Sequence, residues 1–257
     1  MARCVVEERE AFQIPTRHMH RALAARERKM EIKSKEDWML LMKKAHGGDT
    51  KAMNEVAFWY RNGLKIDNNE IIIENENESF NWTKKAYDLG DLQATEEYAD
   101  YLTDKENGIC EPNIELGIKL YEKCFQNGSK RAAHCLGLEN RNKQQFDKAF
   151  EYYTKSEPNE DFYQELTTAL CYYYGVGVKA DKLEALKILL RINNKEEYTT
   201  YEVGEANYLM GMIYLEGDVV EQDLDKARYY LELADQDGDH RSAQELLIII
   251  GRKKLLN

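Results

Sequence analysis

One helix-loop-helix pattern recurs along this chain, and it limits the fold more than any other feature of the sequence. The clearest copy spans residues 206–239. Apolar residues recur four, five and eight positions after Ala206, which places them on one face of a helix. Gly217 ends that helix, and a second apolar run closes at Gly238. A single hairpin of this kind cannot bury its own apolar faces, so neighbouring hairpins must cover them.

The same spacing appears four more times, so the sequence predicts about five stacked hairpins. First helices are predicted to begin near Ala52, Ala94, Ala132, Leu166 and Ala206. Second helices are predicted at 82–90, 120–128, 149–156, 185–192 and 227–238. Small residues recur where helices would cross closely, and an aromatic residue follows one turn later. The third copy departs from this pattern, because Asn140 replaces the aromatic residue and the following loop is short.

These residues resemble the Sel1-like (Sel-one-like) repeat family, which is related to the tetratricopeptide repeats. The closing Gly-Asp pair of the family is matched at Gly48, Gly90 and Gly238, each followed by Asp, and its Gly-rich loop is matched at 173–178. The resemblance covers roughly residues 35–250 and implies an all-α, right-handed α-solenoid with terminal capping helices. It also implies a protein that binds other proteins. Some secreted relatives carry a disulfide in each repeat, a pattern that this chain lacks.

We expect one continuous solenoid over residues 31–257, because each hairpin of a repeat array contacts only its neighbours. Residues 1–30 are rich in Arg and form a separate leader, which is either disordered, a helical arm or a non-native extension. Residues 35–46 are expected to be the N-terminal capping helix. Residues 242–256 are expected to be the last helix, with apolar residues on every side. The end of the chain either covers that surface or leaves it for a homodimer contact.

Two segments interrupt the spacing of the repeats. Residues 71–78 begin with three Ile and continue with alternating Glu, so we expect a solvated loop pinned by the Ile residues or an acidic arm for a basic partner. Residues 193–204 are a longer connection that contains Tyr198 and Tyr201. Loops of this kind often carry binding residues, although most do not.

The charge of the chain restricts its partners. The whole chain has a net charge of −11 at pH 7. The leader holds seven basic and four acidic side chains, so the remainder has 29 basic and 43 acidic ones, a net charge near −14. An acidic body without a basic stripe repels nucleic-acid phosphates and suits a basic protein partner. With neither a secretory signal nor a membrane-spanning run in the sequence, we expect a cytoplasmic protein that does not bind membranes.

Motifs for catalysis or metal binding are missing from the sequence, so we expect no metal and no cofactor. His18 and His20 form a pair, but they lie in the leader. His134 and Cys135 are adjacent, so a helix would turn them about 100° apart. The five cysteines form no CxxC pair. No nucleophile elbow or phosphate-binding loop is present either, and an uncharacterised enzyme is therefore the least favoured class.

A partner is expected on the concave surface, which the first helices of such hairpins usually line. Val56 is predicted to face the core, and the residues two before and two after it lie about 200° around the helix. The corresponding positions in all five repeats form what we call the first-helix track. Its candidate binding residues are Phe58, Glu96, Asp100, His134, Tyr172, Tyr208 and Met212, and its other positions are Asn54, Leu138 and Thr168.

The aromatic residues of the track would be anchors, Glu96 and Asp100 a central acidic spot, and His134 a pH-sensitive contact. The sequence thus favours a non-enzymatic adaptor or scaffold. One alternative is an immunity protein that neutralises a basic bacterial toxin, such as a nuclease, because bacterial proteins that resemble these repeats occur as immunity partners of secreted effectors. An acidic groove would suit that role.

Overall fold

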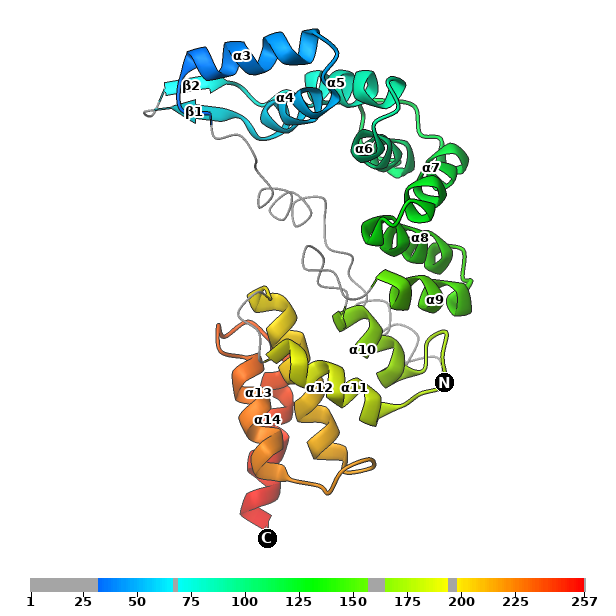
Figure 1. Ribbon diagram of the computed structural model, residues 1–257. Coiled ribbons are helices and arrows are strands. Elements are labelled where there is room, and N and C mark those ends of the chain that lie inside the picture. The colour runs from blue at the N-terminus through cyan, green and yellow to red at the C-terminus, as the bar shows by residue number, and fades with distance from the viewer. Residues whose placement is uncertain (1–31, 67–68, 157–164, 194–197, 257) are drawn as a thin grey trace.

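The computed structural model describes residues 32–66, 69–156, 165–193 and 198–256. In these ranges the chain forms twelve helices and one pair of short strands. The helices follow one another along an open arc, with α3 at one end and α13 and α14 at the other (Figure 1). The predicted leader, residues 1–30, lies outside the described residues.

The helices alternate as five hairpins between two end helices, as the sequence predicted. The first helices are α4 (Thr50–Asn62), α6 (Leu92–Thr103), α8 (Lys130–Asn142), α10 (Glu165–Tyr174) and α12 (Thr200–Glu216). The second helices are α5 (Glu76–Asp88), α7 (Ile114–Gln126), α9 (Phe146–Ser156), α11 (Lys182–Asn193) and α13 (Leu224–Ala234). The end helices are α3 (Lys35–His46) and α14 (Arg241–Leu256).

Gly-Asp pairs separate consecutive helices: Gly48 and Asp49 join the end helix α3 to the first hairpin, and Gly90 and Asp91 join the first hairpin to the second. Gly48 and Gly90 adopt φ angles of 93° and 86°, which side chains with a Cβ rarely tolerate. The carboxylate of the following Asp then accepts a hydrogen bond from the backbone amide three residues later, as Asp49 does from the amide of Ala52 at 3.1 Å. The glycine therefore ends one helix, and the aspartate caps the next.

Small residues bring the two helices of a hairpin together, as the spacing predicted. A Cβ at Gly211 of α12 would lie 2.7 Å from Cγ of Leu231 in α13. A Cβ at Gly137 of α8 would lie 2.5 Å from a ring carbon of Tyr153 in α9. Both distances are far below ordinary carbon–carbon contact. The helix spacing in these two hairpins therefore depends on glycine.

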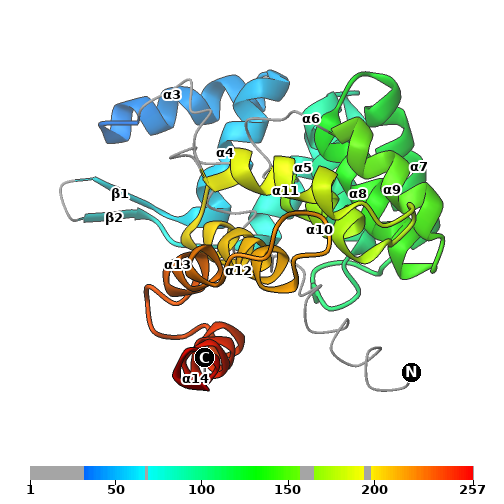
Figure 2. The same cartoon turned by 90° about the horizontal axis from the view of Figure 1, so that it is seen from below.

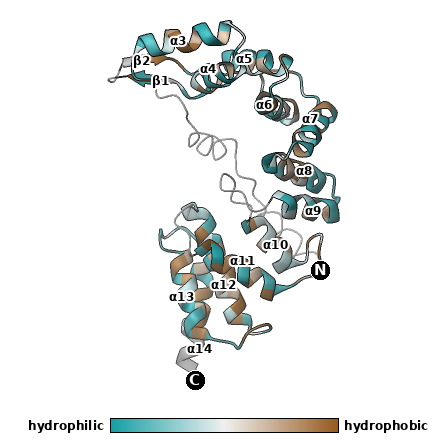
Figure 3. Cartoon of the chain, in the orientation of Figure 1, coloured by the Kyte–Doolittle hydropathy of each residue, from teal (hydrophilic) through white to brown (hydrophobic). Residues whose placement is uncertain are grey.

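Buried side chains form a series of clusters along the arc. Helices pack mainly against the helices next to them in sequence. Val56 of α4 and Trp82 of α5 belong to a cluster at the N-terminal end, whereas Leu189 of α11 and Met210 of α12 belong to another near the C-terminal end. Hydrophilic and hydrophobic residues alternate along the helices throughout the arc (Figure 3). Stability in such a structure is a sum of local contacts.

The first insertion is a β-hairpin and not the predicted loop. β1 (Leu64–Ile66) pairs antiparallel with β2 (Asn69–Ile72), and Leu64 lies opposite Ile72. Both of these side chains are buried, so the apolar residues fasten the strand pair to the first hairpin. The pair projects beside α4 at the edge of the solenoid (Figure 2). Glu76 and Glu78, predicted to lie in the loop, belong to the first turn of α5, where they suit the helix dipole.

The second insertion is shorter than predicted, because α12 already begins at Thr200. The side chain of Thr199 accepts a hydrogen bond from the amide of Glu202 at 3.3 Å, and the Glu202 carboxylate accepts one from the amide of Thr199 at 3.1 Å. This reciprocal pair is a capping box. The spacing Thr-x-x-Glu was visible in the sequence and could have placed the start of the helix.

The last helix keeps part of its apolar surface in contact with solvent. Ile250 of α14 is buried, but Ile248 is 55% exposed and Ile249 is 46% exposed. The homodimer contact at this helix stays a prediction. None of the helices within the described ranges is long and apolar enough to cross a bilayer.

We expect Gly211→Ala to destabilise the protein by about 1–3 kcal/mol, because the added methyl group would collide with Leu231. Urea unfolding followed by circular dichroism measures the effect. Gly251→Ala is the matched control, since Gly251 is a helical glycine with open space around it. The control should lose no stability and can gain up to about 1 kcal/mol from helix propensity. Equal effects of the two substitutions would contradict the close-approach argument.

Candidate functional site

All seven candidate residues of the first-helix track lie on first helices, as predicted. Phe58 lies on α4, Glu96 and Asp100 on α6, His134 on α8, Tyr172 on α10, and Tyr208 and Met212 on α12. Figure 1 shows α6 nearer the hollow of the arc than its partner α7. Phe58, Tyr172, Tyr208 and Met212 are all partly buried, so part of each side chain is accessible to solvent.

His134 does not reach the surface. Its side chain is only 6% exposed, and its ring centroid lies 5.7 Å from that of Tyr153. Asn54 and Thr168, at the same position in other repeats, are buried as well. The amide of Asn54 donates a hydrogen bond to Asp91 of the next repeat at 2.9 Å. His134 contacts the second helix of its own hairpin and Asn54 contacts the next repeat, and neither contact can be deduced from the angle around a single helix.

Two aromatic residues of the track, Tyr172 and Tyr208, each pack one side of the ring against another aromatic ring. The ring of Tyr172 meets Phe150 of α9 edge to face, with centroids 5.2 Å apart. The ring of Tyr208 stacks on His240 at 4.8 Å. These contacts fix the orientation of both rings without enclosing them. A rigid aromatic with an accessible edge loses little conformational entropy when a partner covers it.

The predicted acidic spot is an ion-paired network. Arg131 of α8 contacts Glu96 at 2.8 Å and Asp100 at 2.5 Å. Ser129 Oγ donates a hydrogen bond to Glu96 at 2.6 Å, and the Tyr121 hydroxyl donates one to Asp100 at 2.7 Å. Both carboxylates are therefore occupied by side chains of the following helices. Burial alone would lower the pKa of Arg131, but Asp100 and Glu96 raise that pKa well above its usual value.

A similar network joins the first two repeats. Arg61 of α4 contacts Glu97 of α6 at 3.2 Å and donates a hydrogen bond to the Tyr101 hydroxyl at 3.3 Å. The same hydroxyl donates to Glu76 of α5 at 2.8 Å. Burial would lower the pKa of Arg61, and Glu97 raises it. These two arginines hold successive first helices in register, a role that was not predicted from the sequence.

Within the described ranges, no group of three or more His, Cys, Asp or Glu side chains could hold a metal ion. Burial raises the pKa of the Cys124 thiol to about 11 and that of Cys135 to about 12. A thiol with so high a pKa is a poor nucleophile near neutral pH. These cysteines therefore serve packing.

We expect Arg131→Met to destabilise the protein by about 2 kcal/mol, because it leaves the Glu96 and Asp100 carboxylates without their cation. Urea unfolding measures the loss. Lys119→Met is the control, since it breaks an exposed ion pair with Glu115 and should leave the midpoint unchanged.

Adding Glu96→Gln and Asp100→Asn to the Arg131 variant should recover part of the stability, because the uncompensated charges disappear. A triple variant no more stable than Arg131→Met would show that the guanidinium acts through packing alone.

Comparisons with known proteins agree with this architecture. The model of the Sel1 repeat family matches residues 50–91, 96–129, 132–156, 168–192 and 204–239. A protective antigen present in uropathogenic Escherichia coli strains, which displays an SLR fold, aligns with a TM-score of 0.66 and 19% identity over 84% of this chain. This chain spans only 44% of that antigen.

A Sel1 repeat protein from Oxalobacter formigenes aligns with a TM-score of 0.63 and 19% identity, covering 82% of this chain and 80% of the other. A search of curated proteins finds no match. Sel1 repeat proteins are generally protein-interaction proteins, and the fold is typically non-enzymatic. With five matched repeats that together make up more than half of its length, the chain belongs to the Sel1 repeat family.

Proposed function

We propose that this protein is a non-enzymatic adaptor or scaffold that binds a partner protein along its first-helix track. The observation that carries the proposal is a set of partly exposed apolar side chains at equivalent positions of three of the five first helices, α4, α10 and α12: Phe58, Tyr172, Met212 and the neighbouring Tyr208. Aromatic and Met side chains are enriched in the cores of protein interfaces. Phe58 lies in the first hairpin and the other three residues lie in the fourth and fifth, so a partner that reaches all of them needs an extended segment that follows the arc.

The charge of the proposed partner follows from the whole chain more than from the track. Arg131 pairs with both Glu96 and Asp100 and offsets one of their two negative charges, so these carboxylates are poor candidates for the main attraction to a partner. The net charge of −11 still favours a basic partner through long-range steering. Steering of this kind raises the association rate and weakens as salt is added.

The same acidic charge favours a second candidate, an immunity protein for a basic toxin. The two candidates differ in affinity and in the number of partners. An immunity protein should bind one partner with a dissociation constant on the order of nanomolar or below, and that partner should be toxic when it is expressed alone. A scaffold should recover several partners more weakly.

The test is affinity capture from the cell of origin with the full chain, followed by titration of the captured protein. We expect Tyr172→Ala to weaken binding by about tenfold or more, which corresponds to about 1.4 kcal/mol, because it removes a pre-oriented anchor. Tyr229→Ala is the matched control, since Tyr229 is an exposed aromatic residue on the second helix α13. Circular dichroism and thermal unfolding check that both variants keep the fold.

The proposal for the track fails if the two variants bind equally well. Loss of binding with Tyr229→Ala alone would move the interface to the second helices. A captured partner that kills cells when expressed alone, and is rescued by this chain, would favour the immunity function over the scaffold.

A further inference from the structure

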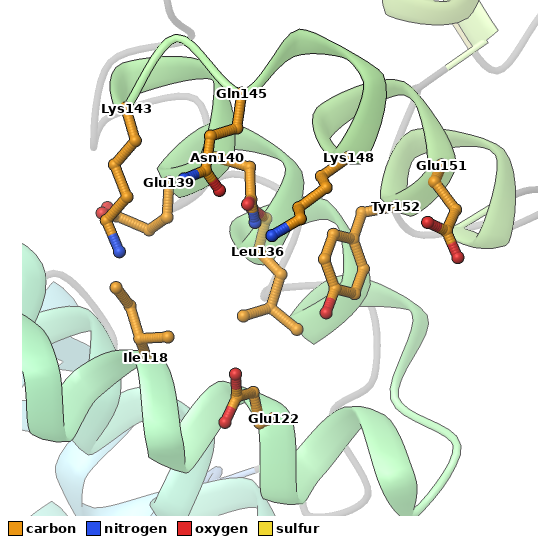
Figure 4. A pocket seen from close by; sticks show the side chains of 10 residues that line it. All are labelled: Ile118, Glu122, Leu136, Glu139, Asn140, Lys143, Gln145, Lys148, Glu151 and Tyr152. Carbon is orange, nitrogen blue, oxygen red and sulfur yellow. The ribbon is translucent and has the colours of Figure 1, made fainter.

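A cavity at the third hairpin is not used by the proposed protein-binding surface. Its volume is about 350 Å³, and it lies where the C-terminal end of α8 meets α7 and α9. Figure 4 shows side chains from all three helices and from the α8–α9 turn pointing into this space. The size falls at the lower end of the range for small-molecule sites.

The cavity exists because the third repeat departs from the pattern of the others. Asn140 stands where the other first helices have Tyr60, Leu102, Tyr174 and Tyr214. In the fifth repeat, the ring of Tyr214 stacks on Tyr230 of its own second helix, with centroids 5.6 Å apart. Asn140 instead turns back and donates a hydrogen bond to the carbonyl oxygen of Leu136 at 2.7 Å. The space that a large side chain would fill stays open.

The short turn after α8 leaves the cavity uncovered. Residues 143–145 connect α8 directly to α9. In longer loops of other repeats, Cys110 and Val220 pack back against the core. Gln144 has a φ of 59°, and within the described ranges no other non-glycine residue has a positive φ. This conformation ends α8, because the amide of Gln144 donates a hydrogen bond to the carbonyl of Arg141 and the amide of Gln145 donates one to the carbonyl of Asn140.

The cavity is lined by charges of both signs, and Glu122, Lys143 and Lys148 are exposed. Lys143 and Lys148 enter from the α8–α9 side, where Glu139 lies beside Lys143, and Glu122 enters from α7 facing them (Figure 4). Among the described residues no ion pair joins Glu122 to either lysine. The apolar side chains of Ile118 and Leu136 line the space between these charges.

The chemistry of the walls selects among ligand classes. The carboxylates of Glu122, Glu139 and Glu151 and the ammonium groups of Lys143 and Lys148 line the space, so an ion of either sign meets repulsion as well as attraction. Burial raises the pKa of Glu139, and the charges of Lys143 and Lys105 oppose that shift. A ligand that carries both charges can pair with side chains of both signs at once.

We propose that this cavity binds a compact zwitterion of the size of a free amino acid or a dipeptide. The ligand carboxylate faces Lys143 and Lys148, and its ammonium group faces Glu122. The apolar part of the ligand contacts Ile118 and Leu136. This site is separate from the first-helix track, and it does not depend on the proposed function.

The test is a thermal-shift screen of the full chain with the twenty free L-amino acids and alanylalanine, followed by calorimetric titration of any stabilising probe. We expect at least one probe to bind saturably. Blocking its amino group by acetylation, or its carboxylate as the amide, should weaken binding by about tenfold or more, because each blocked form loses one charged contact. No saturable probe, or equal binding of the blocked forms, overturns the proposal.

Variants assign the binding to the cavity. Lys148→Met and Glu122→Gln should each weaken binding of the probe by about tenfold. Lys123→Met, an exposed residue of α7 that does not line the cavity, should not change it. Asn140→Tyr restores the large side chain of the other repeats and should abolish binding while the fold is kept. Wild-type affinity in Asn140→Tyr would overturn the proposal. The proposal also fails if no probe binds the wild type and Asn140→Tyr is more stable to heat, and the cavity is then a packing defect.

Discussion

The close approach of the two helices within each hairpin is the constraint on which the rest of the structure depends. Gly137 and Gly211 sit where a methyl group would overlap the partner helix, so these hairpins have a fixed spacing. Ala57 and Ala99, at the same position in other repeats, are fully buried. Because the hairpins have similar thickness, they can stack at regular intervals and curve into an arc. The first-helix track exists only because this stacking repeats.

Polar contacts then determine how one hairpin sits on the next. Arg61 and Arg131 each bind carboxylates on the neighbouring first helix, where a rigid guanidinium can contact two acceptors. Apolar stacking alone would allow adjacent hairpins to slide, since hydrophobic contact is not directional. Glu96 and Asp100, which the sequence predicted to contact a partner, are paired with Arg131 in one of these networks. An acidic residue that pairs with an arginine to hold two repeats in register is therefore no longer available to attract a partner.

The sequence predicted the hairpins, their order and both end helices, because spacing of apolar and small residues is a local property that recurs. The sequence did not predict which side chains are buried or ion-paired by contact with another helix. His134 is buried by packing that one helix cannot reveal, and Glu96 is paired with an arginine 35 positions away in the chain. Arg in a region dominated by Lys was the signal for that network, since Arg suits partly buried ion pairs. The Asn140 anomaly was visible, but its consequence required the three-dimensional arrangement.

The division of the core into separate clusters has a mechanical consequence. Hairpins joined in series behave like springs in series, so small rotations at each joint add along the arc. A partner that grips two adjacent hairpins meets a stiff surface, because only one joint can yield. A partner that spans from α4 to α12 meets a compliant one, since every joint between them contributes. The length of the bound segment therefore sets how much the protein must bend to hold it.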